Sequence, residues 1–232
     1  MSDSKLPAGQ YETDKFPRFG LSQFANRFPK EIDKIELKIE GDVENIFVVS
    51  NELIKELEEV EQISDFHCVT TWTYKSIKWK GYKFLDFFQK IVLPKSKPKK
   101  EATYVIFRCQ DGYRVSLPLE DLLNEDVILA NSLNDVALTI EHGAPLRLVA
   151  PKHYGYKNAK HIKSIEFCLD ESKYKPAAFR FMDHPRARVN LEERGRYFPG
   201  WVLRYIYRPL IQPTVWQFQR ALNNYLDSKS KK

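Results

Sequence analysis

Cys68, in the stretch DFHCVTTW, is the residue of this sequence best suited to chemistry. A lone cysteine is most often a small buried hydrophobic residue. Here it is flanked by His67 and by Thr70 and Thr71, polar neighbours that are unusual for a core position. A thiolate needs nearby positive charge or a metal to be populated at neutral pH. The residue types leave three functional interpretations open: a nucleophile, a zinc ligand or a ligand to a soft metal.

Two of these interpretations have little local support. A structural zinc site uses four nitrogen or sulfur ligands, usually in paired spacing. The side chains of His67 and Cys68 diverge if the segment is extended, and the other histidines are scattered at positions 142, 153, 161 and 184. A cysteine hydrolase needs only a histidine nearby in space, so spacing does not exclude it, although no hydrolase signature surrounds Cys68.

The segment HGAPLRLVAPKHYGYKNAKHIKSIEF (142–167) is the second candidate for chemistry. Glycines let the backbone approach a ligand, and arginine and lysine neutralise phosphate or orient polar rings. The segment matches neither the Walker pattern nor GxGxxG. Its composition is that of a solvated loop between strands or of an anion-binding loop. The residues concerned are His142, Arg147, Lys152, Lys157 and Lys160, with Gly143 and Gly155 between them.

Around these residues the pattern predicts a mainly β body. Residues 34–41 alternate apolar and charged side chains, as in a half-buried strand, and 46–50 continues as strand. Ser50 is placed to cap a short helix over 51–59. Residues 65–79 are again β-rich, and 84–91 reads as a short helix that ends at the Pro/Lys loop 94–100.

Turn residues place the later strands. Asp111-Gly112 joins strands over 103–109 and 113–119, and Asn134-Asp135 marks a second turn. Further β-rich runs cover 142–151 and 161–169. We therefore expect the α+β class, a mixed-sheet body over 25–170 with short helices. An N-terminal arm (1–24) precedes the body, and a C-terminal extension (171–232) follows it.

The C-terminal extension is rich in arginine and proline and shows little periodicity until its last part. There, residues 213–226 predict an amphipathic helix with one apolar face. That face comprises Val215, Phe218, Leu222 and Tyr225.

Composition limits the partners and the compartment. Seven lysines in the loop 95–100 and the tail 229–232 account for the whole net charge of +6, so we expect no nucleic-acid partner. No apolar run approaches the roughly 18 residues of a membrane-spanning helix, and the N-terminus shows no export signal. Three cysteines without CxxC spacing favour a reducing compartment, and the cytoplasm is the expectation.

Several motifs in order resemble one family. They are LPAGQ (6–10), FPRFGLSQFA (16–25), DFHCVTTW (65–72), WKG (79–81), YVIFRCQDGY (104–113), and the long block from His142 to Phe167. Together they resemble the molybdopterin-binding catalytic domain of the sulfite oxidase superfamily. That superfamily includes sulfite oxidases and the catalytic subunit of periplasmic methionine-sulfoxide reductase. The resemblance implies the fold of that domain and Mo-molybdopterin, the molybdenum cofactor.

The resemblance also assigns roles to residues. It implies that Cys68 is the molybdenum ligand and that Arg18, in an N-terminal arm lining the site, lies near the position of a substrate-binding arginine. Molybdenum is soft enough to favour thiolate. The implied cofactor contacts are Phe19, Cys68, Cys109, His142, Arg147, Asn158, Ala159 and Lys160.

Departures from the sulfite oxidases affect the expected substrate. Asn131 stands in the stretch where those enzymes have a pocket tyrosine, and VTTW replaces their arginine-containing run after the cysteine. We therefore expect an oxidoreductase that transfers an oxygen atom at a cysteine-ligated molybdenum, with S- or N-oxide reduction favoured. Sulfite oxidation and a non-catalytic cofactor- or anion-binding protein are the alternatives. The expected partners are a small-molecule substrate and an external electron-transfer protein.

Overall fold

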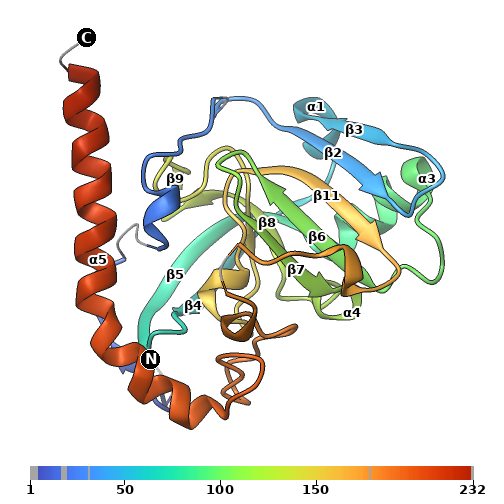
Figure 1. The fold of residues 1–232 in the computed structure, drawn as a ribbon. Helices are drawn as coiled ribbons and strands as arrows, with labels where there is room; N and C mark the ends of the chain where they lie inside the picture. Colours follow the sequence, from blue (N-terminus) through green and yellow to red (C-terminus); the bar gives the residue numbers. More distant parts are fainter. Residues whose placement is uncertain (1–4, 17–19, 31, 178, 231–232) are drawn as a thin grey trace.

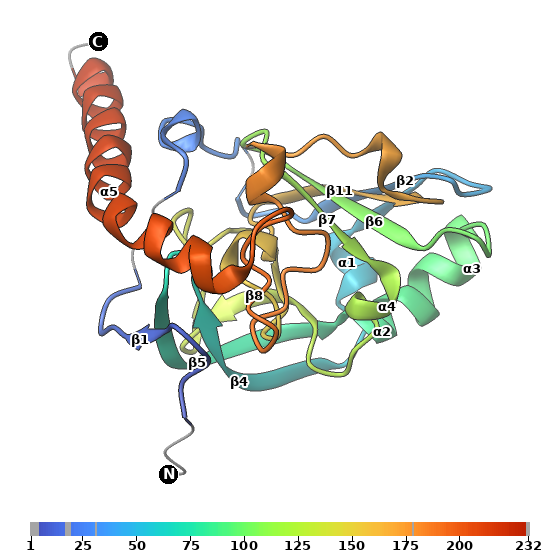
Figure 2. The ribbon, with the colours of Figure 1, turned by 60° about the horizontal axis from the view of Figure 1, so that its bottom comes forward.

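The computed structural model describes residues 5–16, 20–30, 32–177 and 179–230. Two mixed β-sheets form the body, with short helices at their edges and one long helix beside them (Figures 1 and 2). This arrangement confirms the expected α+β class.

The first sheet carries the candidate metal ligand at the end of one of its strands. Its main order is β1-β5-β8-β10, with β4 paired to β5 and β9 paired to β8. Strand β5 (Trp72–Lys83) is the longest and runs antiparallel to both β4 and β8. The other members are β1 (Tyr11–Glu12), β4 (Glu59–His67), β8 (Ile128–Leu133), β9 (Val136–Ala137) and β10 (Arg147–Val149).

The second sheet has the order β3-β2-β11-β6-β7. Strands β2 and β11 are parallel, and the remaining neighbours are antiparallel. The strands are β2 (Glu36–Gly41), β3 (Phe47–Ser50), β6 (Tyr104–Cys109), β7 (Arg114–Pro118) and β11 (Ile162–Cys168).

The main core lies between the two sheets. Leu37 and Ile39 alternate inward along β2 and join Phe107 of β6 and Leu129 of β8 in one buried cluster, as the period of two along a strand requires. A helical segment closes this core with Phe84, Phe87 and Ile91. It consists of α2 (Phe84–Phe87), the π-helical turn η2 (Phe88–Val92) and α3 (Leu93–Ser96).

The short elements are α1 (Asn51–Ile54), α4 (Leu119–Leu122) and four 3-10 turns. These turns are η1 (Ser22–Phe24), η3 (Gly155–Lys157), η4 (Glu171–Lys173) and η5 (Arg180–Met182).

Two helix boundaries differ from the sequence prediction. Ser50 caps α1 as expected, with its hydroxyl accepting from the Leu53 N–H. The helix nevertheless ends at Ile54 and not at 59, because the chain from Glu59 pairs with β5 along its whole length. The second helix continues to Ser96, because Pro94 lies in the first turn of α3, where its missing N–H costs nothing.

Both predicted turns are confirmed. Asn134 and Asp135 adopt positive φ values of 49° and 64° and connect β8 to β9, as a two-residue hairpin turn requires. Gly112 has φ 87° between β6 and β7, and the Asp111 carboxylate accepts from the Tyr113 N–H at 2.9 Å.

The C-terminal helix α5 (Gly200–Ser230) begins well before the predicted start at 213. Pro209 and Pro213 lie inside it, and the helix changes direction within its first half (Figures 1 and 2), as expected where proline removes backbone hydrogen bonds. Phe218 on its apolar face is buried, and Tyr225 stacks on Phe28 at 5.4 Å between ring centroids. None of the described helices has the length and apolarity needed to cross a membrane.

Candidate functional site

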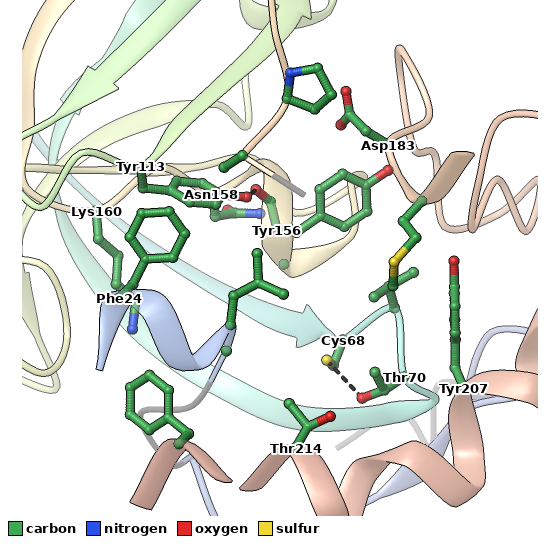
Figure 3. Close-up of a pocket in the computed structure, with 18 of the residues that line it drawn as sticks. Phe24, Cys68, Thr70, Tyr113, Tyr156, Asn158, Lys160, Asp183, Tyr207 and Thr214 are labelled. Carbon is green, nitrogen blue, oxygen red and sulfur yellow. Dashed lines mark hydrogen bonds between the residues drawn. The ribbon is translucent and has the colours of Figure 1, made fainter. Parts of the chain in front are cut away.

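Cys68 lies in a tight turn between β4 and β5. Its N–H donates to the Trp72 carbonyl at 2.8 Å, and its carbonyl accepts from the Thr71 N–H at 3.1 Å. Thr71 has a φ of 88°, a rare conformation for a β-branched residue. The Thr70 hydroxyl lies 3.1 Å from the Cys68 Sγ (Figure 3). The strained turn thus presents the sulfur in a fixed direction.

Two distant segments hold this turn in place. The Gln10 amide donates to the Cys68 carbonyl at 3.0 Å. The fully buried Arg194 guanidinium donates to the Val69 carbonyl at 2.6 Å and to the Ala8 carbonyl at 3.0 Å. Arg194 therefore ties the C-terminal extension and the N-terminal segment to the cysteine turn.

The sulfur faces a cavity of about 320 Å³, within the range of roughly 300–1,000 Å³ that is usual for ligand pockets. Its walls are mainly aromatic and aliphatic, and they come from the sheet, the N-terminal segment and the C-terminal extension (Figure 3). Among the wall residues are Phe16, Leu21, Phe24, Phe66, Trp72, Tyr113, Tyr156, Tyr174 and Met182.

Three of the predicted cofactor contacts line this cavity: Cys68, Asn158 and Lys160. The Asn158 amide serves the backbone, since its oxygen accepts from the Ala150 N–H at 2.7 Å. The Lys160 ammonium donates to the Glu141 carbonyl at 2.8 Å. Of these three, Cys68 and Lys160 carry the groups suited to a metal and to an anion.

His142 lies beside the cavity and not in its wall. Its ring stacks on the wall residue Phe16 at 5.2 Å between ring centroids. Burial, with added repulsion from Lys160 and Arg147, lowers the pKa of His142 to about 4. The imidazole is therefore neutral at pH 7.

Arg147 is fully buried and is not among the residues that line the cavity. Its guanidinium sits 4.7 Å from the Trp79 ring centroid and donates to the His142 carbonyl at 2.9 Å. Its Nε and Nη2 are buried without a hydrogen-bond partner among the described residues, and burial lowers its pKa to about 9. A buried guanidinium lacking an acidic partner is costly, so its free donors are ready for an anion.

Two further predicted contacts, Cys109 and Ala159, are not among the residues that line the cavity. Cys109 and Ala159 pack in the main core between the sheets, and burial raises the pKa of the Cys109 thiol well above its usual value. Arg18 and Phe19 lie outside the described residues. The individual cofactor contacts of these residues stay predictions.

Asn131 was expected to stand in the substrate pocket, and the structure corrects this expectation. The Asn131 amide donates to the Glu59 carboxylate at 2.8 Å, and the residue does not line the cavity above Cys68. Its side chain therefore gives no information about the substrate, because it pairs with the neighbouring strand β4.

The C-terminal extension supplies a wall that the sequence did not predict. Tyr207, Leu210, Thr214 and Phe218 of α5 line the cavity opposite the Cys68 turn (Figure 3). Tyr207 is buried, and its hydroxyl has no hydrogen-bond partner in the described part of the chain. In the sequence, only the apolar spacing at 215–225 predicted this helix. That spacing does not indicate which part of the molecule the helix covers.

A buried ion pair joins the extension to the body at the cavity edge. The Lys157 ammonium lies 3.1 Å from the Asp183 carboxylate and donates to the Ser116 carbonyl at 2.9 Å. Burial lowers the pKa of Lys157, and Asp183 opposes that shift. Arg196 also donates to the Asp183 carbonyl at 3.3 Å.

The donor set fits a metal that brings most of its own ligands. No cluster of three or more His, Cys, Asp or Glu side chains among the described residues could hold a metal ion. A single thiol does face the cavity, and burial raises its pKa while Thr70 and the positive charge of Arg194 lower it. A bound metal deprotonates a coordinating thiol outright. One protein thiolate, Lys160 in the same cavity wall and the buried, unpaired Arg147 donors fit an anionic cofactor with a soft metal.

Comparison with known proteins decides the family. Residues 25–175 match the model of the oxidoreductase molybdopterin-binding domain. The chain belongs to this family. It is therefore an oxidoreductase that uses the molybdopterin cofactor, as the order of motifs predicted.

Two relatives and one solved structure show the range of similarity. The uncharacterized oxidoreductase YuiH of Bacillus subtilis is 34% identical over 163 residues, which cover 70% of this chain and 79% of YuiH. The protein-methionine-sulfoxide reductase catalytic subunit MsrP of Campylobacter jejuni is 28% identical, over 82% of this chain and 70% of MsrP. The sulfane dehydrogenase SoxCD from Paracoccus pantotrophus shares the fold, with a TM-score of 0.53 and 22% identity, over 66% of this chain and 43% of SoxCD.

Proposed function

We propose that the chain reduces neutral S-oxides, with the sulfoxide of a thioether as the substrate class. The observation that carries the proposal is the wall of the cavity above Cys68. Lys160 is the one lysine or arginine among the described lining residues, and it shares the lining with two carboxylates, Asp111 and Asp183. An anionic substrate such as sulfite requires a net positive, preferably bidentate, partner. The similarity to MsrP also supports this class.

The chain's own residues have distinct parts in this reaction. The bound cofactor supplies the oxygen-atom transfer and redox chemistry. Cys68 would hold the metal through its thiolate, with Thr70 orienting the sulfur. The aromatic walls exclude water and accept the apolar substituents of the sulfur. Lys160 would bind the anionic end of the cofactor.

Electron supply is part of the same proposal. Reduction of a sulfoxide to a thioether and water consumes two electrons and two protons. We propose that an external electron-transfer partner delivers the electrons. The three free, buried cysteines support placement in a reducing compartment, the cytoplasm, and fractionation of source cells with detection of the native protein tests that placement.

The function is tested by turnover of the cofactor-loaded enzyme with reduced viologen as the electron donor. Methionine sulfoxide and dimethyl sulfoxide are compared with an N-oxide, and sulfite is tested in the oxidative direction with ferricyanide. We expect viologen oxidation with the sulfoxides, and no comparable ferricyanide reduction with sulfite. Faster turnover of sulfite than of any sulfoxide would refute the proposal.

Cys68→Ser is the control for chemistry at the metal. It should abolish turnover and the sulfur-to-metal charge-transfer absorption and leave the circular dichroism spectrum unchanged. Wild-type absorption and turnover in this variant would remove Cys68 from the site. Cys168→Ser is the matched control, because Cys168 lies outside the cavity wall and should change neither readout.

A further inference from the structure

The outer side of α5 exposes a run of large apolar side chains. Trp201, Tyr205 and Trp216 are 58%, 62% and 60% exposed, and Ile206 and Leu210 are also exposed. Tyr197 and Phe198, which lead into the helix, are exposed as well. We call six of these residues the aromatic face, leaving out Leu210, which lines the cavity. Contiguous exposed apolar patches mark contact surfaces in soluble domains.

The aromatic face belongs to a helix whose opposite side is already used. Leu203, Tyr207 and Phe218 are buried at helical spacing against the body. The helix therefore already packs against the body through its inner side, and the exposed outer side is a separate surface of the described chain. Figures 1 and 2 show α5 at the edge of the molecule, with its outer side turned away from both sheets. A convex surface of this kind suits a broad, flat partner better than it suits an inserted peptide.

Charge gives the chemistry of that partner. The sequence from Gly195 to Leu226 contains four arginines and no aspartate or glutamate. Arg208 is exposed three residues after Tyr205 of the aromatic face, and the Arg220 guanidinium lies 5.1 Å from the Trp216 ring centroid. Lysines at 229, 231 and 232 follow. Arg196 and Arg204 pair with Glu171 and Glu192, so Arg208 and Arg220 supply the positive charge beside the apolar rings.

We propose that the aromatic face docks on the surface of an anionic lipid bilayer. Tryptophan and tyrosine favour the headgroup level, where their rings are buried and their polar atoms stay wet. Arginine stems lie along apolar surface and direct their charge to lipid phosphates. After Trp216 the outer side becomes polar, with Gln217, Gln219 and Asn223. The helix thus lies in the interface plane along its first half.

Docking in this way has a consequence for the cavity. Tyr207 and Leu210, which line the cavity, belong to the same turns of α5 as the aromatic face. The bilayer would therefore lie against the outer side of the cavity's helical wall. The proposal is independent of the substrate class and stands if the sulfoxide assay fails.

The test is co-sedimentation of the purified holoenzyme with vesicles. Phosphatidylcholine vesicles are compared with vesicles that also contain phosphatidylglycerol, at low and high salt. We expect binding to the anionic vesicles that weakens with salt. The triple variant Trp201→Gln/Tyr205→Gln/Trp216→Gln should lower the partition coefficient about tenfold or more, and Arg208→Gln should lower it about fivefold. None of these four residues lines the cavity.

The matched control is Ile63→Gln/Val136→Gln. These residues are 71% and 64% exposed on the first sheet and belong neither to α5 nor to the aromatic face, and the variant should bind vesicles like the wild type. Brominated lipids provide a second readout, because Trp72 and Trp79 are buried while Trp201 and Trp216 are exposed. We expect quenching of tryptophan fluorescence that disappears in the triple variant, with the thermal midpoint unchanged in both variants.

Three outcomes would overturn the proposal. The first is no sedimentation with anionic vesicles. The second is equal loss of binding in the control variant. The third is a dimer in solution that the triple variant dissociates, with no vesicle binding, which would assign the aromatic face to a second copy of the chain.

Discussion

Arg194 is predicted to set both the stability and the metal occupancy of the site. Its guanidinium is fully buried and donates to two backbone carbonyls, at Val69 and Ala8, that belong to the cysteine turn and the N-terminal segment. It also pairs with Glu192 at 3.2 Å and lies 4.9 Å from the Tyr154 ring centroid. Arg194→Met removes the charge and both carbonyl contacts while keeping an apolar stem of similar length.

The expected cost follows from those contacts. A hydrogen bond to a charged group contributes about 1.5–3 kcal/mol, and each carbonyl left buried without a donor adds a penalty. Glu192 would keep only Arg204, at 3.5 Å. We expect the free energy of unfolding to fall by about 3–5 kcal/mol, the range for breaking a buried ion pair. Arg194→Lys should recover part of this loss, because lysine keeps the charge without arginine's planar fork.

Metal occupancy and the visible spectrum distinguish a positioning role of Arg194 from a purely stabilising one. Loss of the Val69 contact loosens the turn that presents Cys68, so molybdenum per chain should fall. The charge-transfer absorption of the remaining holoenzyme should broaden or shift. The measurements are urea unfolding of the metal-free chain, elemental analysis and the visible spectrum. Arg188→Met is the control, because Arg188 pairs with Glu193 on the partly exposed surface of the same extension and should cost about 1 kcal/mol or less. A destabilised Arg194→Met with full occupancy and an unchanged spectrum would refute the positioning role.

Four further perturbations test single groups. Tyr207→Phe should lower kcat/KM for sulfoxides about two- to tenfold if the unpaired hydroxyl donates to the S-oxide oxygen, with stability unchanged; an unaltered kcat/KM would remove it from the reaction. Lys160→Gln should lose about one to two decades of cofactor affinity, while activity per bound molybdenum stays normal. His142 has a pKa of about 4 in the folded protein and of about 6.5 in the unfolded chain. Between these two pH values the unfolded state binds one more proton, so the free energy of unfolding falls as the pH drops from about 6.5 to about 4. His142→Gln should flatten that pH dependence, which urea unfolding across the range measures. Arg18→Met should raise KM for sulfite and leave KM for methionine sulfoxide unchanged if Arg18 binds anions; equal KM values in wild type and variant for both substrates would exclude Arg18 from binding.

Local features of the sequence predicted the body well. The Asn134-Asp135 and Asp111-Gly112 turns require positive φ that these residue types tolerate, so the hairpins could be placed without tertiary information. The assignment of Cys68 came instead from the family resemblance, because the residue types around it left three functional interpretations open. The predictions that failed concern features that depend on contacts between segments distant in the sequence. The predicted helix after Ser50 ends at Ile54, and β4 takes its predicted last residue, Glu59, into the sheet.

The C-terminal extension shows why part of the site was out of reach. Arg194 reaches Val69 across 125 residues of sequence, and neither residue carries a pattern that predicts the contact. The start of α5 was missed because Pro209 and Pro213 indicate helix ends, whereas here the packing of Tyr207 and Phe218 stabilises a bent helix through both prolines. Periodicity finds the apolar face of a helix and leaves open what that face covers.

The extension completes the catalytic domain physically, although the family match ends at residue 175. Without it, Lys157 would be a fully buried ammonium deprived of Asp183, a loss that costs about 3–5 kcal/mol in a buried pair. The cysteine turn would lose the donor at Val69, and the cavity would lose its α5 wall. The turn between β4 and β5 supplies the candidate metal ligand Cys68, and the extension contributes a wall of the cavity that this residue faces. Substitutions in the α5 wall are therefore expected to change substrate access, whereas substitutions of Arg194 are expected to reach the metal site.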